Sequence, residues 1–513
     1  MSSFGYKPFQ NISSQPPGIT TVNGEPLTSF GEMSVAELTP AGQGDFIYGI
    51  NNQIFTVKQF SGGTITSTNG MATVQSGISS TGSSILHLRR NLKYKPGMGS
   101  LSRLTALFDT PASQNYQLAG IGNPESGYYF GYNGTNFGIF HFQTGQKEIR
   151  KVTINTAAGT QNVNVTLNGV TVAVPVTGGS DVNRTAYELA RYDYTGVGTG
   201  WFADAIDGAV YFISALPGTY TGSYSLTGTG AASGSFTSII AGSGSTMTFT
   251  SQSSWNIDRM DGGQSGALNA SKLTLNPLMG NVYQIGFQYL GFGNAFFAIE
   301  NPDNGRMMPV HMIKNAGART TPVLKNPQMS TRVISQNIGN TTNVQPKTVS
   351  MAEFTEGKSL RLDPRFAATG SFASLTSTSY VGLLAVKVNR TFNNLTCNGE
   401  IDALRIAASS NSNGISVAVF KNVQINGVVN FSYVDQTNSI VSTSYLGATG
   451  TSLTLNGAAP LVSFSVGNGG AAVLELNPED MVVSSGEILV IAVKTFAGNN
   501  PTGEVAINWF EQQ

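Results

Sequence analysis

The sequence predicts a mainly β protein with two β-sandwich domains, a small α+β insertion and an extended N-terminal arm. Only 11% of the 513 residues are charged and 61 are glycine, so strong helix formers are scarce. Short apolar stretches separated by Gly, Ser, Thr and Asn recur along most of the chain, which is typical of strands joined by turns. At roughly 100–200 residues per domain, the length predicts about three domains.

The first 43 residues are predicted to form an extended, proline-rich arm. Each proline fixes φ and removes a donor from any sheet, and no lasting periodicity is present. The arm is nevertheless more apolar than a plain linker needs to be. We therefore expect it to anchor the chain on a partner, with a disordered linker as the alternative. The candidate anchoring residues are Phe4, Tyr6, Phe9 and Ile12.

One sandwich is predicted to combine two separate parts of the chain, residues 44–150 and 254–355. Both parts contain short apolar stretches divided by turn residues. In the first part, two aromatic runs flank Asn133-Gly134, and Asn-Gly favours a two-residue hairpin turn because it tolerates positive φ angles. Residues 151–253 are then an insertion, which is geometrically simple when both of its ends leave neighbouring strands.

The insertion is predicted to be a small α+β domain. Apolar and polar residues alternate on both sides of Asn168-Gly169, which places six apolar side chains on one face of a hairpin. The predicted pairs are Val163 with Val174, Val165 with Val172, and Leu167 with Val170. A helix capped by Ser180 or Asp181 follows, and a second hairpin is expected around Asp207-Gly208. The apolar stripe of the helix is Val182, Ala186, Leu189 and Ala190.

Residues 356–513 are predicted to form the second sandwich. Eight short strands at this spacing fit a jelly roll or a related two-sheet fold. The predicted strands are 380–390, 401–407, 415–421, 428–434, 462–466, 472–476, 488–495 and 504–510.

Composition and missing motifs exclude several classes of function. The 28 basic and 28 acidic residues balance, which removes the electrostatic attraction that dominates nucleic-acid binding. No apolar run is long enough to span a bilayer, and the N-terminus lacks the apolar core of a secretion signal. Cys397 is the only cysteine, so neither a disulfide framework nor a thiolate zinc site is expected. Phosphate-binding, dinucleotide-binding and serine-nucleophile motifs are also missing. We therefore expect no cofactor, no metal and no catalysis.

Carboxylates and histidines offer only weak alternatives. Glycosidases on β-sandwiches use two carboxylates, but the candidate pairs lie among Gly, Asn and Pro and are interpreted as solvated turn residues. These pairs are Asp258 with Asp261, Glu300 with Asp303, and Glu353 with Glu356. Asp258 and Asp261 are also calcium candidates, although the EF-hand spacing is absent. The three histidines, His87, His141 and His311, are far apart in sequence and are interpreted as structural.

Two groups of side chains are candidate contact sites. The first is a basic cluster made of Arg89, Arg90, Lys93 and Lys95. It predicts contact with an acidic partner subunit, and the alternative is a solvated edge strand protected by charge. The second is an aromatic group made of Tyr128, Tyr129 and Tyr132. Its flat rings are candidates for stacking on glycans, and packing in the core is the alternative.

Several segments together resemble structural proteins of large double-stranded DNA viruses. The segments are GYYFGYNGTNFG (127–138), NVYQI (281–285), QYLGFG (288–293), ENP (300–302) and VAINWFE (505–511). They are similar to surface and fibre-like proteins of chlorella viruses and other algal or protist viruses, with relatives in tailed phages. The resemblance implies a virion component with a lectin-like first sandwich and a second β domain. It implies no catalytic residues.

We therefore predict a non-enzymatic virion protein, either a minor capsid component or a capsid-attached fibre or spike. It is expected to be made in the host cytoplasm and to lie at the particle surface. The expected partners are other capsid or fibre subunits, further copies of itself and host glycans, with no nucleic acid and no membrane insertion. The alternatives are a phage tail-fibre or baseplate protein, a carbohydrate-binding module and a polysaccharide-degrading enzyme.

Overall fold

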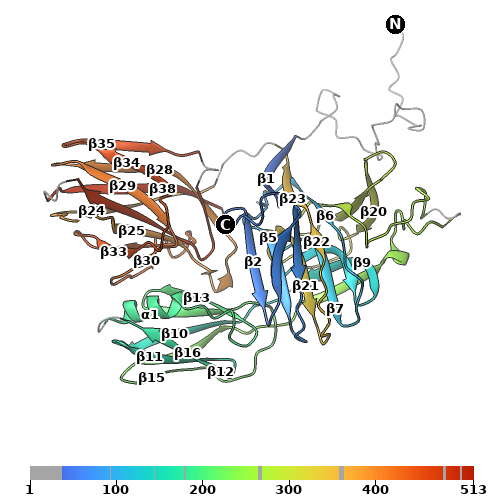
Figure 1. Ribbon diagram of the computed structural model, residues 1–513, viewed down its shortest axis with the longest axis horizontal. Coiled ribbons are helices and arrows are strands. Elements are labelled where there is room, and N and C mark those ends of the chain that lie inside the picture. Colours follow the sequence, from blue (N-terminus) through green and yellow to red (C-terminus); the bar gives the residue numbers. More distant parts are fainter. Residues whose placement is uncertain are drawn as a thin grey trace, which may run out of the picture.

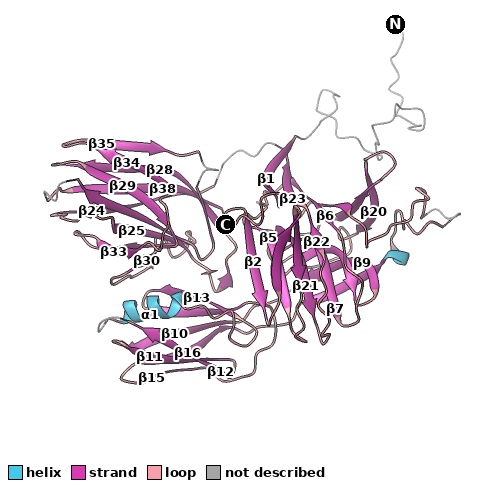
Figure 2. Cartoon of the chain, viewed as in Figure 1, coloured by secondary structure: helices cyan, strands magenta, loops and turns pink. Residues whose placement is uncertain are grey.

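The computed structural model describes residues 37–92, 94–143, 145–177, 181–263, 268–357, 363–477, 481–496 and 500–512. The fold of these residues is mainly β, as predicted, and all of their paired strands lie in antiparallel sheets (Figures 1 and 2). The four candidate anchoring residues of the arm, Phe4, Tyr6, Phe9 and Ile12, lie outside the described residues. Within the described part of the chain, no helix is long and apolar enough to cross a membrane.

The first sandwich consists of two large sheets and a small three-stranded sheet. The six-stranded sheet has the order β1 (Leu38–Asp45), β23 (Ser350–Glu356), β6 (Gly99–Ala106), β18 (Asn281–Phe287), β19 (Ala295–Glu300) and β20 (Met307–Ile313). The seven-stranded sheet has the order β17 (Thr246–Ser251), β9 (Asn136–Gln143), β8 (Gly127–Asn133), β7 (Asn115–Gly122), β21 (Ser330–Asn337), β5 (Ser83–Leu88) and β2 (Phe55–Phe60). The small sheet contains β22 (Lys347–Thr348), β4 (Met71–Gln75) and β3 (Thr64–Thr68). Between the large sheets lies an aromatic core that includes Phe130, Tyr283 and Phe297.

Two boundaries of the first sandwich differ from the prediction. Strand β1 begins at Leu38, inside the predicted arm, and pairs with β23 at the edge of its sheet. Its Pro40 is tolerated because an edge strand needs no donor on its open side, and a register shift separates Pro40 from Gly42. Strand β17, predicted as part of the insertion, pairs with β9 in the sandwich.

The hairpin of β8 and β9 forms with a turn one residue later than predicted. Asn133 pairs with Asn136, and the two turn residues are Gly134 and Thr135. Gly134 has φ of 60°, and a two-residue turn with positive φ only at its first position requires glycine there. The prediction that Asn133 belongs to the turn was wrong, and Tyr132 consequently lies opposite Phe137.

The insertion forms a seven-stranded sheet with one helix. The strand order is β12 (Val170–Val176), β11 (Gln161–Leu167), β15 (Ser225–Gly228), β16 (Ser233–Ile240), β10 (Ile149–Thr156), β14 (Ala209–Ser214) and β13 (Trp201–Ile206). The predicted register of the hairpin at Asn168-Gly169 is confirmed for all three pairs. However, Val170 is 43% exposed, so the shared apolar face is not buried along its whole length.

Helix α1 (Val182–Arg191) forms where it was predicted. The carboxylate of Asp181 accepts a hydrogen bond from the backbone N–H of Arg184 at 3.0 Å, as an N-cap residue does. Ala186 and Leu189 are buried against the sheet. Ser180, the other predicted cap, lies outside the described residues.

The C-terminal sandwich contains a five-stranded and an eight-stranded sheet. The five-stranded sheet comprises β24 (Arg365–Phe372), β38 (Gly503–Gln512), β28 (Glu400–Ser410), β35 (Ala471–Glu475) and β36 (Val482–Ser484). The eight-stranded sheet comprises β30 (Gln424–Ile425), β33 (Thr451–Thr454), β25 (Val381–Val388), β37 (Ile488–Thr495), β29 (Ile415–Lys421), β34 (Val462–Val466), β31 (Ser432–Tyr433) and β32 (Val441–Tyr445). The predicted strand at 428–434 is reduced to the two residues of β31. In these two sheets, the strands that were missed are β24, β30, β32, β33 and β36.

The insertion contacts both sandwiches, and its helix faces the C-terminal sandwich (Figure 1). The guanidinium of Arg184 donates to the carbonyl of Ile425 at 2.8 Å. Tyr187 packs in an apolar cluster that includes Phe420 and Phe431. On the other side, Ala215 of the insertion packs with Phe60 and Ile85 of the first sandwich. The three units therefore form one continuous body.

Candidate functional site

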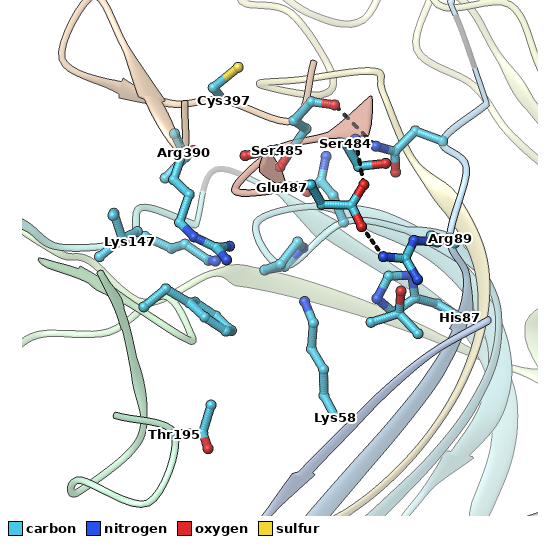
Figure 3. A pocket seen from close by; sticks show the side chains of 18 of the residues that line it. Lys58, His87, Arg89, Lys147, Thr195, Arg390, Cys397, Ser484, Ser485 and Glu487 are labelled. Atoms are coloured by element: carbon cyan, nitrogen blue, oxygen red, sulfur yellow. Dashed lines mark hydrogen bonds and ion pairs between the residues drawn. The ribbon is translucent and has the colours of Figure 1, made fainter. Parts of the chain in front are cut away.

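A cavity of about 520 Å³ lies where the three units meet, and all three contribute to its lining (Figure 3). The first sandwich contributes side chains from the outer face of its seven-stranded sheet. The insertion contributes Phe202 of β13, and the C-terminal sandwich contributes Arg390 and the turn that contains Ser485 and Glu487. Arg390 directly precedes the short hairpin of β26 (Thr391–Phe392) and β27 (Leu395–Thr396). We regard this cavity as the candidate functional site.

Strand alternation explains why polar side chains of the first sandwich reach the cavity. Successive residues of a strand point to opposite faces of the sheet. On β2, Phe55 points into the core and Lys58 points outward, and on β5 the core residue Leu86 precedes the outward His87. Arg332 of β21 lies opposite His87 in the register. Three neighbouring strands thus place Lys58, His87 and Arg332 on one outer face.

The cavity is dominated by four cationic side chains, which we call the cationic cluster. Its members are Lys58, Lys147, Arg332 and Arg390. Three of them surround the ring of Phe202: the Nζ atoms of Lys58 and Lys147 and the Cζ atom of Arg390 lie 5.3, 5.5 and 5.1 Å from its centroid. Cations at this distance from an aromatic ring interact favourably with its electron-rich face. The ring of Phe202 thus offsets part of the repulsion among three cationic side chains.

Burial and mutual repulsion both act against the charges of the cluster. Burial lowers the pKa of Lys58 well below its usual value, and the charges of Lys147, Arg332 and Arg390 lower it further. Burial also lowers the pKa of Lys147 to about 8, with Glu125 opposing the shift. The pKa values of Arg332 and Arg390 are lowered chiefly by burial as well.

Carboxylates near the cluster oppose the lowering of its pKa values: Glu125 acts on Lys147, Asp204 on Arg390 and Glu353 on Arg332. Among the described residues, none of its four side chains forms an ion pair with a carboxylate. Glu125 instead accepts the backbone N–H of Lys147 at 3.3 Å and the hydroxyl of Thr396 at 2.8 Å. Glu487, which lines the cavity, pairs with Arg89 and with Lys421. Asp193 also lines the cavity but is exposed.

Two further polar groups of the lining have no hydrogen-bond partner within the described residues. They are Nε2 of His87 and Nδ2 of Asn398. The Nδ1 atom of His87 lies 2.7 Å from the carbonyl oxygen of Leu88, so it carries the proton and leaves Nε2 as an acceptor. Burial, followed by the charges of Lys58 and Arg332, lowers the pKa of His87 well below its usual value, which keeps the ring neutral. The lining of the cavity thus combines cationic side chains with neutral polar side chains.

The cavity does not assemble a recognisable nucleophile. Cys397 lines it, but burial raises the pKa of its thiol to about 12, and the thiolate is the reactive form of cysteine. The described residues contain no group of three His, Cys, Asp or Glu side chains suited to a metal ion. The arrangement can bind an anion.

The predicted tyrosine contact site is wrong. Tyr128, Tyr129 and Tyr132 are only 1%, 3% and 7% exposed. Strand β8 lies in the middle of its sheet, and both faces of that sheet are covered. Tyr128 and Tyr132 pack in the core of the sandwich, whereas Tyr129 packs on the outer face against Phe140. These rings are therefore core residues and cannot stack on a glycan.

The predicted basic cluster is used within the chain. Arg89 pairs with Glu487 of the C-terminal sandwich, and Lys95 lies 3.4 Å from Asp363. Arg90 lines a separate cavity near β1, and Lys93 lies outside the described residues. The ion-pair partners that the structure shows for Arg89 and Lys95 are thus in the same polypeptide, and the predicted contact with another subunit stays a prediction.

Other residues singled out in the sequence have structural roles or unexpected neighbours. The carboxylate of Asp258 is buried and accepts hydrogen bonds from Met260 N, Ser271 N and Ser271 Oγ, so it fixes a loop. Glu353 is fully buried as well, so the interpretation of Asp258 and Glu353 as solvated turn residues was wrong. His141 and His311, far apart in sequence, line one cavity of about 270 Å³. Burial lowers their pKa values to about 3 and about 4.

Comparison with known proteins adds little to this description. No family model and no curated protein matches the sequence. Three solved structures with similarity are lectin II from Ulex europaeus, the N-terminal CBM22 tandem domain of Xyn10C from Paenibacillus barcinonensis, and a triple jelly-roll protein of an archaeal virus turret. The lectin is 8% identical with a TM-score of 0.20, and covers 62% of this chain and 100% of its own. The CBM22 tandem domain is 7% identical with a TM-score of 0.17, and covers 93% of this chain and 98% of its own. The viral protein is 9% identical with a TM-score of 0.17, and covers 94% of this chain and 98% of its own. At these TM-scores the similarities carry no argument about ligands or partners.

Proposed function

We propose that the protein is a non-enzymatic structural component of a virus particle, either a minor capsid component or a capsid-attached fibre or spike. The assignment to a virus rests on the sequence resemblance to virion proteins. The structural observation that supports a mechanical role is the set of buried charged contacts that join the three units. In this proposal the protein acts as a rigid piece whose surfaces contact other subunits, copies of itself and host glycans.

The strongest of these contacts joins the insertion to the C-terminal sandwich. Lys387 of β25 pairs with Asp204 of β13, and both side chains are only 3% exposed. Asp204 also accepts the backbone N–H of Arg390 at 2.8 Å. Separation of the two units would expose this pair to water, and the loss of either partner alone would leave a buried charge without compensation, which costs about 3–5 kcal/mol.

Further polar contacts join the first sandwich to the C-terminal sandwich. Arg89 pairs with Glu487, and the backbone N–H of Asn91 donates to the carboxylate of Glu400 at 3.1 Å. The amide of Asn91 also donates to the carbonyl of Asn398 at 3.0 Å. Because every pair of units is joined, relative motion of the units is restricted.

The proposal is tested on purified virus particles. Mass spectrometry should detect the chain at a fixed ratio to the major capsid protein, and a particle map should show density for all three units at the surface. Absence of the chain from mature particles would contradict the proposal. Incubation of the purified chain with algal and bacterial polysaccharides tests the enzymatic alternative, and we expect no release of reducing sugar.

A further inference from the structure

The cavity between the three units differs from the contacts around it, because its charges are not matched. In the surrounding contacts, Lys387 pairs with Asp204, while Arg89 and Lys421 share the carboxylate of Glu487. The cationic cluster, made of Lys58, Lys147, Arg332 and Arg390, has no such partner among the described residues. Lys147 and Arg332 are buried, and Lys58 and Arg390 are partly buried. Because buried charges are normally paired, the cluster is suited to an external anion.

The geometry of the cluster also favours a ligand. The side chains of Lys58, Lys147 and Arg390 point into one shared space (Figure 3). Neutral polar side chains, among them Asn123, Thr195 and Ser485, line the same cavity. Such groups can exchange hydrogen bonds with the hydroxyl groups of a ligand. Charged and neutral hydrogen-bonding groups thus surround one volume.

The volume of the cavity limits the size of the ligand. Pockets for small molecules typically span about 300–1,000 Å³, and this cavity measures about 520 Å³. A bare sulfate or phosphate ion would fill only a small part of this volume and would leave the neutral polar lining without a ligand contact. A sugar-sized ligand that carries an anionic group fills the space and uses both kinds of contact.

We infer that this cavity binds an acidic ligand of about monosaccharide size whose sulfate, phosphate or carboxylate group lies among Lys58, Lys147, Arg332 and Arg390. The ligand would contact all three units at once and stabilise their arrangement, because a ligand that binds only the folded state stabilises it. This inference does not depend on a place in a virus particle, and its test uses the isolated chain.

The test is isothermal titration calorimetry of the full chain with glucose 6-sulfate, glucose 6-phosphate and galacturonate. Glucose serves as the neutral probe, and sodium sulfate and sodium phosphate as the bare ions. We expect at least one acidic sugar to bind in a 1:1 ratio, about tenfold or more tightly than glucose and than its bare ion, because charge-assisted hydrogen bonds are the stronger ones. Absence of binding by all three acidic sugars would overturn the inference. Equal affinity for the acidic sugar and its bare ion would overturn the assigned ligand size.

Variants locate the site. Lys58→Gln and Arg390→Gln should each weaken binding about tenfold, since each removes a charged donor. Lys494→Gln is the matched control, because the Nζ atom of Lys494 also lies over an aromatic ring, 4.7 Å from the centroid of Tyr380, but outside the cavity lining. Unchanged binding in Lys58→Gln and Arg390→Gln would overturn the inference.

Thermal unfolding distinguishes a binding role from a structural role. Lys58 forms no ion pair within the described residues and is repelled by its neighbours, so Lys58→Gln should raise the unfolding temperature of the ligand-free chain. The same variant should show a smaller rise on addition of the acidic sugar than the wild type. A lower ligand-free unfolding temperature combined with an undiminished ligand-induced rise would assign Lys58 a structural role and refute the proposed site. Lys58→Gln also keeps the test decisive if Arg390→Gln does not fold.

Discussion

Replacement of Lys387 by methionine should weaken the contact between the insertion and the C-terminal sandwich by about 3–5 kcal/mol, the cost of leaving one member of a buried ion pair alone. Asp204 would retain only the backbone N–H of Arg390, at 2.8 Å. The lysine also donates to the carbonyl of Ala205 at 2.5 Å and lies 4.6 Å from the ring centroid of Phe431. Methionine preserves the apolar stem but supplies neither the charge nor the hydrogen bonds.

The three tryptophans allow each unit to be followed separately. Trp255 lies in the core of the first sandwich, Trp201 in that of the insertion and Trp509 in that of the C-terminal sandwich, and all are at most 1% exposed. Variants that keep one tryptophan and replace the other two by phenylalanine report the denaturant-induced unfolding of one unit each. In a multidomain chain this is preferable to a single midpoint, because unfolding need not be two-state.

In the parent chain we expect the Trp201 and Trp509 signals to change together, because the buried pair couples the two units. In Lys387→Met the Trp201 transition should move to lower denaturant and separate from that of Trp509. The double variant Lys387→Met with Asp204→Leu should recover most of the loss, since an apolar replacement of a whole buried pair is often neutral. Glu475→Gln, which breaks an exposed pair with Arg405, is the control and should change stability by no more than about 1 kcal/mol. A loss below about 1 kcal/mol in Lys387→Met, or no recovery in the double variant, would refute the reasoning.

Three further predictions concern single residues. Burial raises the pKa of Glu353 to about 8, so the folded chain keeps a proton that the unfolded chain releases near pH 4.5, and stability should fall between these pH values by up to about 1.4 kcal/mol per unit. Glu353→Gln should remove this contribution. The measurement is denaturant-induced unfolding from pH 4.5 to 8 with the Trp255 reporter, and an unchanged slope of the unfolding free energy against pH in this variant would contradict the prediction. Asp181→Ala should destabilise the insertion by about 1 kcal/mol through loss of the helix cap, visible with the Trp201 reporter, and an unaltered midpoint would argue against the cap. Cys397, whose thiol pKa is raised to about 12 by burial, should react slowly with iodoacetamide at pH 8 and rapidly in denaturant; equal rates would show that the thiol is accessible.

Local patterns in the sequence were sufficient to predict the elements whose structure depends on neighbouring residues. The register at Asn168-Gly169 and the second hairpin at Asp207-Gly208 both formed as predicted, because side-chain alternation and the turn sequence specify the same pairing. Helix α1 formed with Asp181 as its cap. By contrast, the turn after Asn133 was misplaced, since two turn types that differ by one residue fit the same sequence.

The environments of side chains depended on contacts that no local pattern reveals. Tyr128 and Tyr129 alternate on β8 as residues of a half-exposed strand would, but both faces of their sheet are covered. The covering residues include Phe287 and Phe297 on one face and Phe249 on the other, all more than a hundred positions later in the chain. Burial of the tyrosines was therefore a property of the tertiary fold alone.

The cationic cluster was missed for the same reason, and its position bears on its role. Lys58, Lys147, Arg332 and Arg390 come from four distant segments of the sequence. Only the arrangement of the three units brings them around Phe202. A basic residue that served solubility alone would be stable on the open surface, where water screens its charge. Four of them gather where the three units meet, beside basic residues that do pair with carboxylates, and this arrangement supports the inference that the cavity binds an anionic ligand.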